Sequence, residues 1–235
     1  MEKIIYLVWR DPHIDLEAFG NTLRGALATQ LRALPCVRSL QVNIADAAVA
    51  AGAGLKQTNS HPPLETVVQV WVDSAIAHLR APVDAAIAAH TARHAAYLVT
   101  ESQPLRNLKH PPKPGARTEG FAQIALLRKP QQQAYAEWID IWHNSHTQVA
   151  IDTQSTFEYI QNVVIRPLTP DAPPLDAMVE EGFPIAALND PYTFFDAVGD
   201  EQKFQSNLKT MMDSVYRFID MSRIDVTPTS QYKLI

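Results

Sequence analysis

The chain has 235 residues, of which 46% are hydrophobic and 19% charged, and its formal net charge is −5 at neutral pH. This composition is typical of an ordinary globular protein, and the length allows one large domain or two small ones. The negative charge, without any block of Lys and Arg, argues against a surface for nucleic acid or acidic membranes. The apolar run at the N-terminus is too short for a signal peptide or a membrane span, and the lone Cys36 excludes a disulfide within the chain. We therefore expect a cytoplasmic protein without nucleic-acid or membrane partners.

In the first half, hydrophobic periodicity predicts a strand, a helix, two strands, a second helix and a last strand. The expected ranges are 3–10, 15–33, 37–44, 67–72, 83–91 and 95–100. Between the second and third strands, residues 50–61 are rich in Gly, Ala and polar side chains, which favours a mobile loop.

A segment rich in Pro and basic residues, 104–119, follows and predicts an extended linker, because proline lacks a backbone donor and disfavours helix. Beyond it the same order of elements returns. The expected ranges are 121–128, 131–148, 157–166, 178–183, 202–216 and 223–226.

Two proline-rich segments indicate that the chain is an internal duplication. The sequence Pro-Pro-Leu-Glu at 62–65 corresponds to Pro-Pro-Leu-Asp at 173–176, and the spacing to the other elements agrees. A strand-helix-strand-strand-helix-strand order gives a ferredoxin-like antiparallel sheet with both helices on one face. We therefore predict an α+β protein of two ferredoxin-like repeats, 1–103 and 120–235, whose bare sheet faces pack together. The C-terminal tail, 227–235, can reach across to pair with or cover a sheet edge.

The second half carries one unusual histidine. Trp138, Trp142 and His146 recur at four-residue intervals along one stripe of the predicted helix, which normally faces the sheet. In the strand that follows, Tyr159 and Gln161 point to the same side, about 7 Å apart. His146 is therefore either a core residue whose ring nitrogens are hydrogen-bonded within the protein, or the polar group of a pocket.

These motifs resemble the EthD family of the dimeric α+β barrel superfamily. That family has a Trp followed four residues later by His, then a Tyr-x-Gln-Asn strand and a later acidic residue. The matching positions here are Trp142, His146, Tyr159, Gln161, Asn162 and Glu180, within residues 119–230. The chain departs from the family pattern at Ile141, where a Tyr is usual, and at Val163, where a His is common.

The first half resembles the family only in outline. When Phe19 is aligned with Trp138, Leu23 falls opposite Trp142 and Leu27 opposite His146. We therefore expect the first repeat to have kept the fold and lost the polar site.

The resemblance implies a cavity between helices and sheet that takes a small hydrophobic or aromatic metabolite. In the enzyme hypothesis, the chemistry is cofactor-free acid–base catalysis of a monooxygenase, cyclase, isomerase or decarboxylase type. His146 acts there as general acid or base, and Tyr159 and Gln161 donate to a developing oxyanion. The residues expected to bind the substrate are Trp138, Trp142, Asn162 and Glu180.

Two alternatives stay open. The same residues can orient a ligand in a binding protein without turnover, or His146 or His143 can ligate haem or a metal. Neither the pair His143 and His146 nor the pair His90 and His94 has an acidic or Cys residue at a sequence spacing typical of metal ligands. We therefore expect no metal and no cofactor. A small organic ligand and a homodimer are the expected partners.

Overall fold

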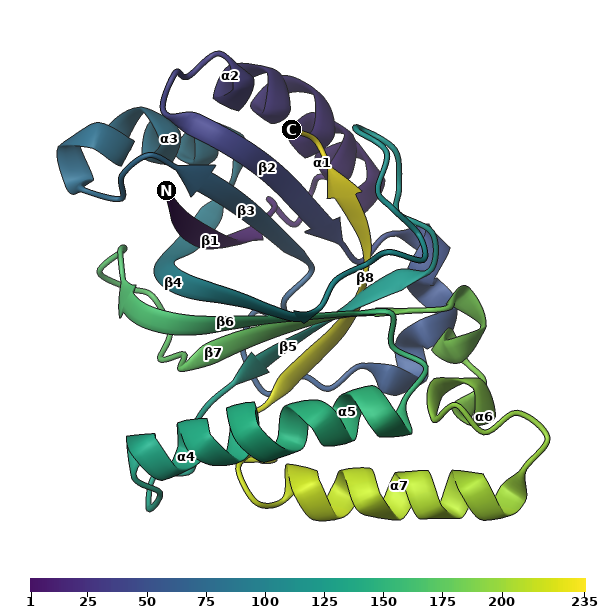
Figure 1. Cartoon of the computed structure of the whole chain (residues 1–235). Coiled ribbons are helices and arrows are strands. Elements are labelled where there is room, and N and C mark those ends of the chain that lie inside the picture. The colour runs from purple at the N-terminus through teal and green to yellow at the C-terminus, as the bar shows by residue number, and fades with distance from the viewer.

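Eight strands, all paired antiparallel with their neighbours, form one closed barrel in the order β1-β3-β2-β8-β5-β7-β6-β4. The computed structural model describes all residues, 1–235, and shows the barrel between two groups of helices (Figure 1). The strands are β1 (Glu2–Trp9), β2 (Val37–Ile44), β3 (Thr66–Val72), β4 (Arg93–Leu105), β5 (Phe121–Leu127), β6 (Glu158–Pro167), β7 (Ala177–Phe183) and β8 (Asp225–Lys233).

Each half contributes four neighbouring strands, in the order β4-β1-β3-β2 for the first half and β8-β5-β7-β6 for the second. This is the strand order expected for a ferredoxin-like unit, so the predicted α+β fold class is confirmed. The two sheets do more than face each other, because they also pair along both edges, β2 with β8 and β4 with β6. The predicted reach of the C-terminal tail is confirmed, since β8 pairs with residues 41–44 of the first half.

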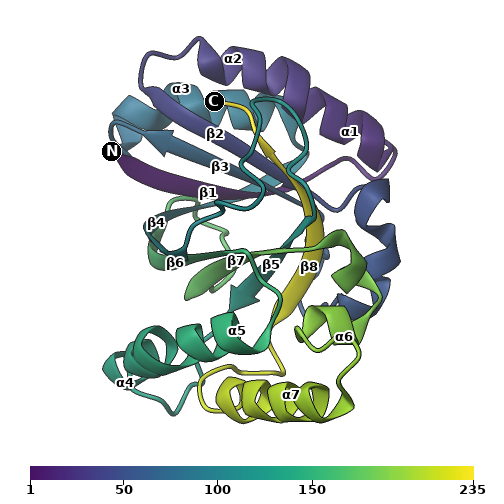
Figure 2. The ribbon, with the colours of Figure 1, turned by 45° about the vertical axis from the view of Figure 1, so that its right-hand side comes forward.

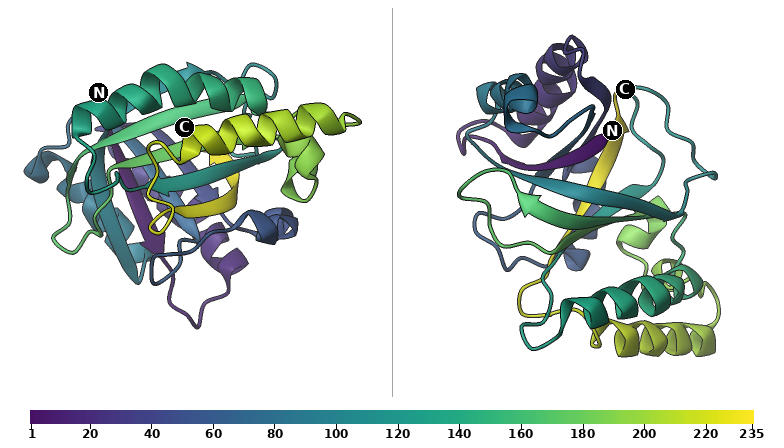
Figure 3. Two further views of the ribbon diagram at one scale, coloured as in Figure 1. Left: turned by 90° about the horizontal axis from the view of Figure 1, so that it is seen from below. Right: turned by 60° about the vertical axis from the view of Figure 1, so that its left-hand side comes forward.

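Long helices cover the outer face of each half. In the first half these are α1 (Leu16–Thr22), the π-helical turn η1 (Leu23–Leu27), α2 (Ala28–Arg32) and α3 (Ala77–His90). In the second half they are α4 (Tyr135–Ile141), the π-helical turn η3 (Trp142–His146), α5 (Thr147–Thr153) and α7 (Glu201–Val215). Helices α5 and α7 lie side by side below the barrel (Figures 2 and 3).

Several sequence-based boundaries were wrong. Strand β4 runs to Leu105, into the predicted linker 104–119, and the helix predicted over 131–148 runs from Tyr135 to Thr153. The segment 50–61 is not simply a loop, because η2 (Ala47–Leu55) forms 3-10 turns there and buries Val49 and Gly52. It packs near the short helices η4 (Ile185–Leu188) and α6 (Pro191–Phe194) of the second half. Helix α3 begins six residues before the predicted 83, and β8 continues well beyond the predicted 226.

Side chains alternate along the strands between the barrel interior and the helices. The interior holds an apolar cluster that includes Ile5, Leu7, Tyr97, Leu126 and Met178, together with a group of polar side chains. An eight-stranded barrel is just wide enough for side chains to fill it, so the interior is a core and not a channel. The larger cavities of the molecule lie outside the barrel wall, beside the helices.

Candidate functional site

A cavity of about 190 Å³ lies between helices and sheet in the second half. Its walls come from β5, β6, β7 and β8 on one side and from η3 and α7 on the other. Most of the lining is apolar, with Met211, Met212, Phe218 and Ile219 on the helical side. The few polar side chains on it are His146, Tyr159, Glu181 and three carboxamides, those of Gln57, Gln123 and Gln154. An apolar cavity with a few convergent polar groups is the usual form of a small-molecule site.

Strand register places three of these polar side chains in one row across the sheet. Glu181 on β7 pairs directly with Gln123 on β5 and with Tyr159 on β6. Directly opposed residues on one face have Cβ atoms about 5 Å apart, so the three side chains are immediate neighbours. The row lies beneath the helices and forms the polar part of the cavity floor.

The carboxyl of Glu181 is buried with almost no hydrogen-bond support. The side chain is 8% exposed, and its one contact is a long hydrogen bond of 3.4 Å donated by Gln123 Nε2 to Oε2. Burial disfavours the charged form and raises the pKa of Glu181 to about 7, and the Gln123 hydrogen bond acts in the opposite direction. A carboxyl that titrates near neutral pH inside an apolar cavity is suited to accept and return a proton.

His146 lies across the cavity in the wide π-helical turn. Its Nδ1 is 3.0 Å from Ser214 Oγ on α7, and its ring centre is 4.4 Å from that of Phe218. Burial, and then the positive charge of Arg217, lower the pKa of His146 to about 4. The imidazole is therefore neutral at physiological pH, and Nε2 has no hydrogen-bond partner in the protein.

Gln161 was predicted to act in catalysis, but it does not line this cavity. Its Nε2 donates to Thr147 Oγ1 at 2.7 Å, and that hydroxyl donates to the carbonyl of Trp142 at 2.7 Å. The Trp142 carbonyl belongs to the π-helical turn, where the regular helical hydrogen-bond pattern is interrupted. Gln161 therefore holds the turn that carries His146 and acts on the site through the backbone.

The two tryptophans are fully buried and hold the layers together. Trp142 Nε1 donates to the Tyr159 hydroxyl at 3.3 Å, and Trp138 Nε1 donates to the carbonyl of Phe218 at 3.0 Å. Neither indole reaches the cavity wall. Burial, followed by the nearby charge of Glu181, raises the pKa of Tyr159, so its hydroxyl stays protonated.

Asn162 and Glu180, both predicted to bind substrate, point into the barrel, on the opposite face of the sheet from His146. Glu180 is fully buried and accepts hydrogen bonds from four carboxamides, those of Gln41, Asn43, Gln69 and Gln231, at 2.8 to 3.0 Å. Asn162 Nδ2 donates to the carbonyl of Met178 at 3.2 Å. Glu180 therefore joins the two halves of the barrel, whereas the Asn162 bond stays within the second half. Both residues are separated from the cavity by the sheet.

Of the seven predicted site residues, His146 and Tyr159 line the cavity together. Sequence reasoning missed Glu181, Gln123, Gln154 and Gln57. The signal for Glu181 was present, since period-two alternation in the strand 177–183 places it on the face opposite Glu180, toward the helices. The signal for Gln57 was absent, because this residue comes from the first half and meets β8 only through the fold.

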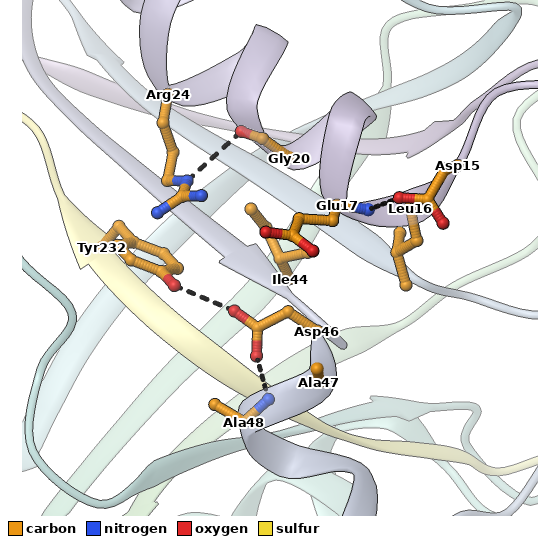
Figure 4. Close-up of a pocket in the computed structure, with 10 residues that line it drawn as sticks. All are labelled: Asp15, Leu16, Glu17, Gly20, Arg24, Ile44, Asp46, Ala47, Ala48 and Tyr232. Carbon is orange, nitrogen blue, oxygen red and sulfur yellow. Dashed lines mark hydrogen bonds between the residues drawn. The ribbon is translucent and has the colours of Figure 1, made fainter.

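A larger groove of about 450 Å³ lies beside α1 in the first half (Figure 4). Three of its charged groups are already paired: the Tyr232 hydroxyl donates to Asp46, Asp15 caps α1, and the Arg24 guanidinium covers the Tyr232 ring at 4.4 Å. The fourth, Glu17, is exposed to solvent. No polar atom there is buried without a partner. We therefore place the candidate site in the cavity of the second half.

No three His, Cys, Asp or Glu side chains converge in an arrangement suited to a metal ion. No helix combines the length and the apolar character that crossing a membrane requires.

Comparisons with solved structures agree with this architecture. An anthrone oxidase-like protein superposes with a TM-score of 0.58 at 8% identity, covering 99% of this chain and 92% of its own. A "putative monooxygenase" from Fusobacterium nucleatum superposes with a TM-score of 0.50 at 11% identity, covering 100% of this chain and 92% of its own. The fold is that of the dimeric α+β barrel proteins.

At such low identity, the likeness to these dimeric α+β barrels shows the fold alone. No protein-family profile matches the sequence. No curated protein matches it either. The narrower resemblance to EthD proteins stays a prediction.

Proposed function

We propose that the cavity beside Glu181 binds a small, largely apolar organic molecule and removes an acidic proton from it without a cofactor. The observation that carries the proposal is the Glu181 carboxyl, which is buried in an apolar cavity, nearly unpaired and has a pKa of about 7. Structural carboxylates such as Glu180 are saturated with hydrogen bonds, whereas Glu181 keeps one oxygen free for a ligand.

Glu181 fits the role of general base better than His146, the residue predicted from sequence. A base is most effective when its pKa lies near the working pH, and burial holds the pKa of His146 at about 4. Neutral His146 fits a different role. If the Ser214 hydroxyl donates to Nδ1, the ring proton lies on Nε2, which then donates to a developing oxyanion in the cavity.

The anthrone oxidase-like neighbour suggests a concrete substrate. Anthrone has an acidic methylene group between two aromatic rings, conjugated with a carbonyl. Transfer of one methylene proton to Glu181 leaves a carbanion whose charge is shared with the carbonyl oxygen, where His146 can donate. Electron transfer to O₂ and recombination form a C–O bond, and Glu181 returns its proton to give a hydroperoxide. Loss of the second methylene hydrogen and of hydroxide then yields anthraquinone and water from anthrone and O₂.

The test is oxygen uptake and anthraquinone formation from anthrone by the full chain, measured against a protein-free baseline. We expect Glu181→Gln to lower kcat/KM by about 10²- to 10⁴-fold, the usual contribution of a general base. The wild-type rate should rise as the pH increases through about 7, where Glu181 loses its proton. Glu137→Gln, which changes an exposed carboxylate on α4, is the matched control and should leave the rate unchanged.

An unchanged rate in Glu181→Gln would show that this carboxyl is not the base. Binding of anthrone by calorimetry with no oxidation by the wild type would instead overturn the reaction and leave a binding protein.

A further inference from the structure

A second cavity, of about 390 Å³, adjoins the first on the side away from His146. The two cavities share five lining residues: Gln57, Gln123, Phe194, Phe195 and Val226. The inner cavity contains the buried Glu181 and His146, whereas the outer one alone includes the exposed residues Gly54, Asn189 and Pro191. The outer cavity therefore lies between the reactive groups and solvent.

The outer cavity is built by both halves of the chain. Gly54, Leu55 and Gln57 come from the η2 segment of the first half, while residues 187–195 come from η4 and α6 of the second. The η2 segment is fixed in place, since Gln57 and Val226 exchange backbone hydrogen bonds of 3.0 and 2.9 Å. A ligand that fills both cavities would therefore contact both repeats.

The chemistry of the lining selects a kind of ligand. Neither cavity has a Lys or Arg side chain on its wall. The one outer carboxylate, Asp190, already accepts from the Tyr192 backbone N–H and the Thr193 hydroxyl. The other polar groups of the outer cavity are the neutral carboxamides of Gln57, Gln123 and Asn189. The inner cavity has a further carboxamide, that of Gln154, which is 8% exposed and whose Oε1 has no partner in the protein. A buried polar atom without a hydrogen-bond partner destabilises the folded protein, so a ligand group that donates to Gln154 Oε1 would gain binding free energy.

We propose that the ligand is elongated and uncharged: its reacting ring occupies the inner cavity, and a neutral polar extension occupies the outer one. An anionic extension would meet no cation and would lie near Glu181 and Asp190, which disfavours phosphate- or carboxylate-tailed ligands. This inference rests on the proposed function for the position of the reacting ring. It adds the length and charge of the ligand, and it makes Gln57 a specificity-determining residue.

The test is calorimetric titration of the full chain with four phenols: phenol, 4-phenylphenol, 4′-hydroxybiphenyl-4-carboxamide and 4′-hydroxybiphenyl-4-carboxylic acid. We expect the carboxamide to bind at least tenfold more tightly than the carboxylate. Gly54→Trp should weaken the carboxamide at least tenfold and leave phenol unchanged. A Cβ at Gly54 meets nothing within 4 Å, so this variant should fold. Gly25→Trp, equally open and on the first-half helix, is the control.

Gln57→Leu gives a second, volume-preserving variant, which should remove the preference for the carboxamide over 4-phenylphenol. The inference would be overturned if the carboxamide and the carboxylate bound equally well and Gly54→Trp had no effect on either. The proposed function would still stand in that case if Glu181→Gln changed the affinity for phenol. Failure of all four phenols to bind the wild type would overturn both.

Discussion

The two halves of the barrel carry the same order of strands, yet one buries a packed core where the other holds a cavity with polar side chains on its floor. In the second half, the row across the sheet is Gln123, Glu181 and Tyr159. The corresponding row in the first half, in the same register, is Ile4, Val70 and Leu40, each fully buried. The helices above the two rows differ in the same way: the π-helical turn ends with the apolar Leu27 in the first half and with the polar His146 in the second.

The shared π-helical turn shows which feature belongs to the fold and which to the site. Such turns often occur at functional positions, but here the first half keeps one with only apolar residues facing inward. The turn alone therefore does not make a site. The candidate site differs from the packed half by a few polar side chains in place of aliphatic ones, and these polar side chains do not fill the same space.

The largest expected effect comes from moving the acid into the packed half. Val70→Glu would bury a carboxyl in a core with no cavity and no donor, and we expect a loss of more than about 4 kcal/mol of unfolding free energy at pH 8. The loss should shrink toward pH 5, because the buried acid binds a proton more readily in the folded state. Urea denaturation at the two pH values measures it. A loss below 1 kcal/mol would mean that the first half has hidden room for a polar group.

Leu27 and His146 form the next comparison. Leu27→Ala removes a fully buried aliphatic side chain and should cost roughly 2–5 kcal/mol. His146→Ala should lower the free energy of unfolding by less than Leu27→Ala does, because one side of the imidazole already faces a cavity. It should also weaken ligand binding or turnover by at least tenfold, about 1.4 kcal/mol. Urea melts and phenol titrations of both variants, run side by side, separate packing from function. Equal destabilisation with unchanged phenol affinity would make His146 an ordinary core residue.

Glu181 itself should reduce stability at neutral pH and above. Its folded-state pKa of about 7 lies above the ordinary value of 4.5, so its favourable contribution is complete below pH 4.5 and is lost as the pH rises through 7. Glu181→Gln removes this loss. Its free energy of unfolding should exceed that of the wild type by up to about 3 kcal/mol at pH 8 and should differ little at pH 4.5. The difference in urea midpoints across this range measures it. A pH-independent difference would contradict the raised pKa.

The sequence predicted the fold well, because period-two and helical patterns are local. The similar segments at Pro62 and Pro173, which we interpreted as a duplication, also led to the ferredoxin-like strand order that each half shows. The site was harder to predict. Family resemblance drew attention to Glu180, but adjacent residues of a strand face opposite sides, and only the assembled barrel shows that Glu181 is the one beneath the helices. Gln57 could not be found locally, since it reaches the cavity from the other half of the chain.

The most direct test of the account is the pKa of the Glu181 carboxyl, measured as the pH-dependent carboxyl signal that disappears in the infrared difference between wild type and Glu181→Gln. We predict one titration with a midpoint near pH 7, shifted further when a phenol occupies the cavity. A midpoint near the ordinary value of 4.5 would show that Glu181 is solvated or paired, and would remove both the base and the contrast between the two halves.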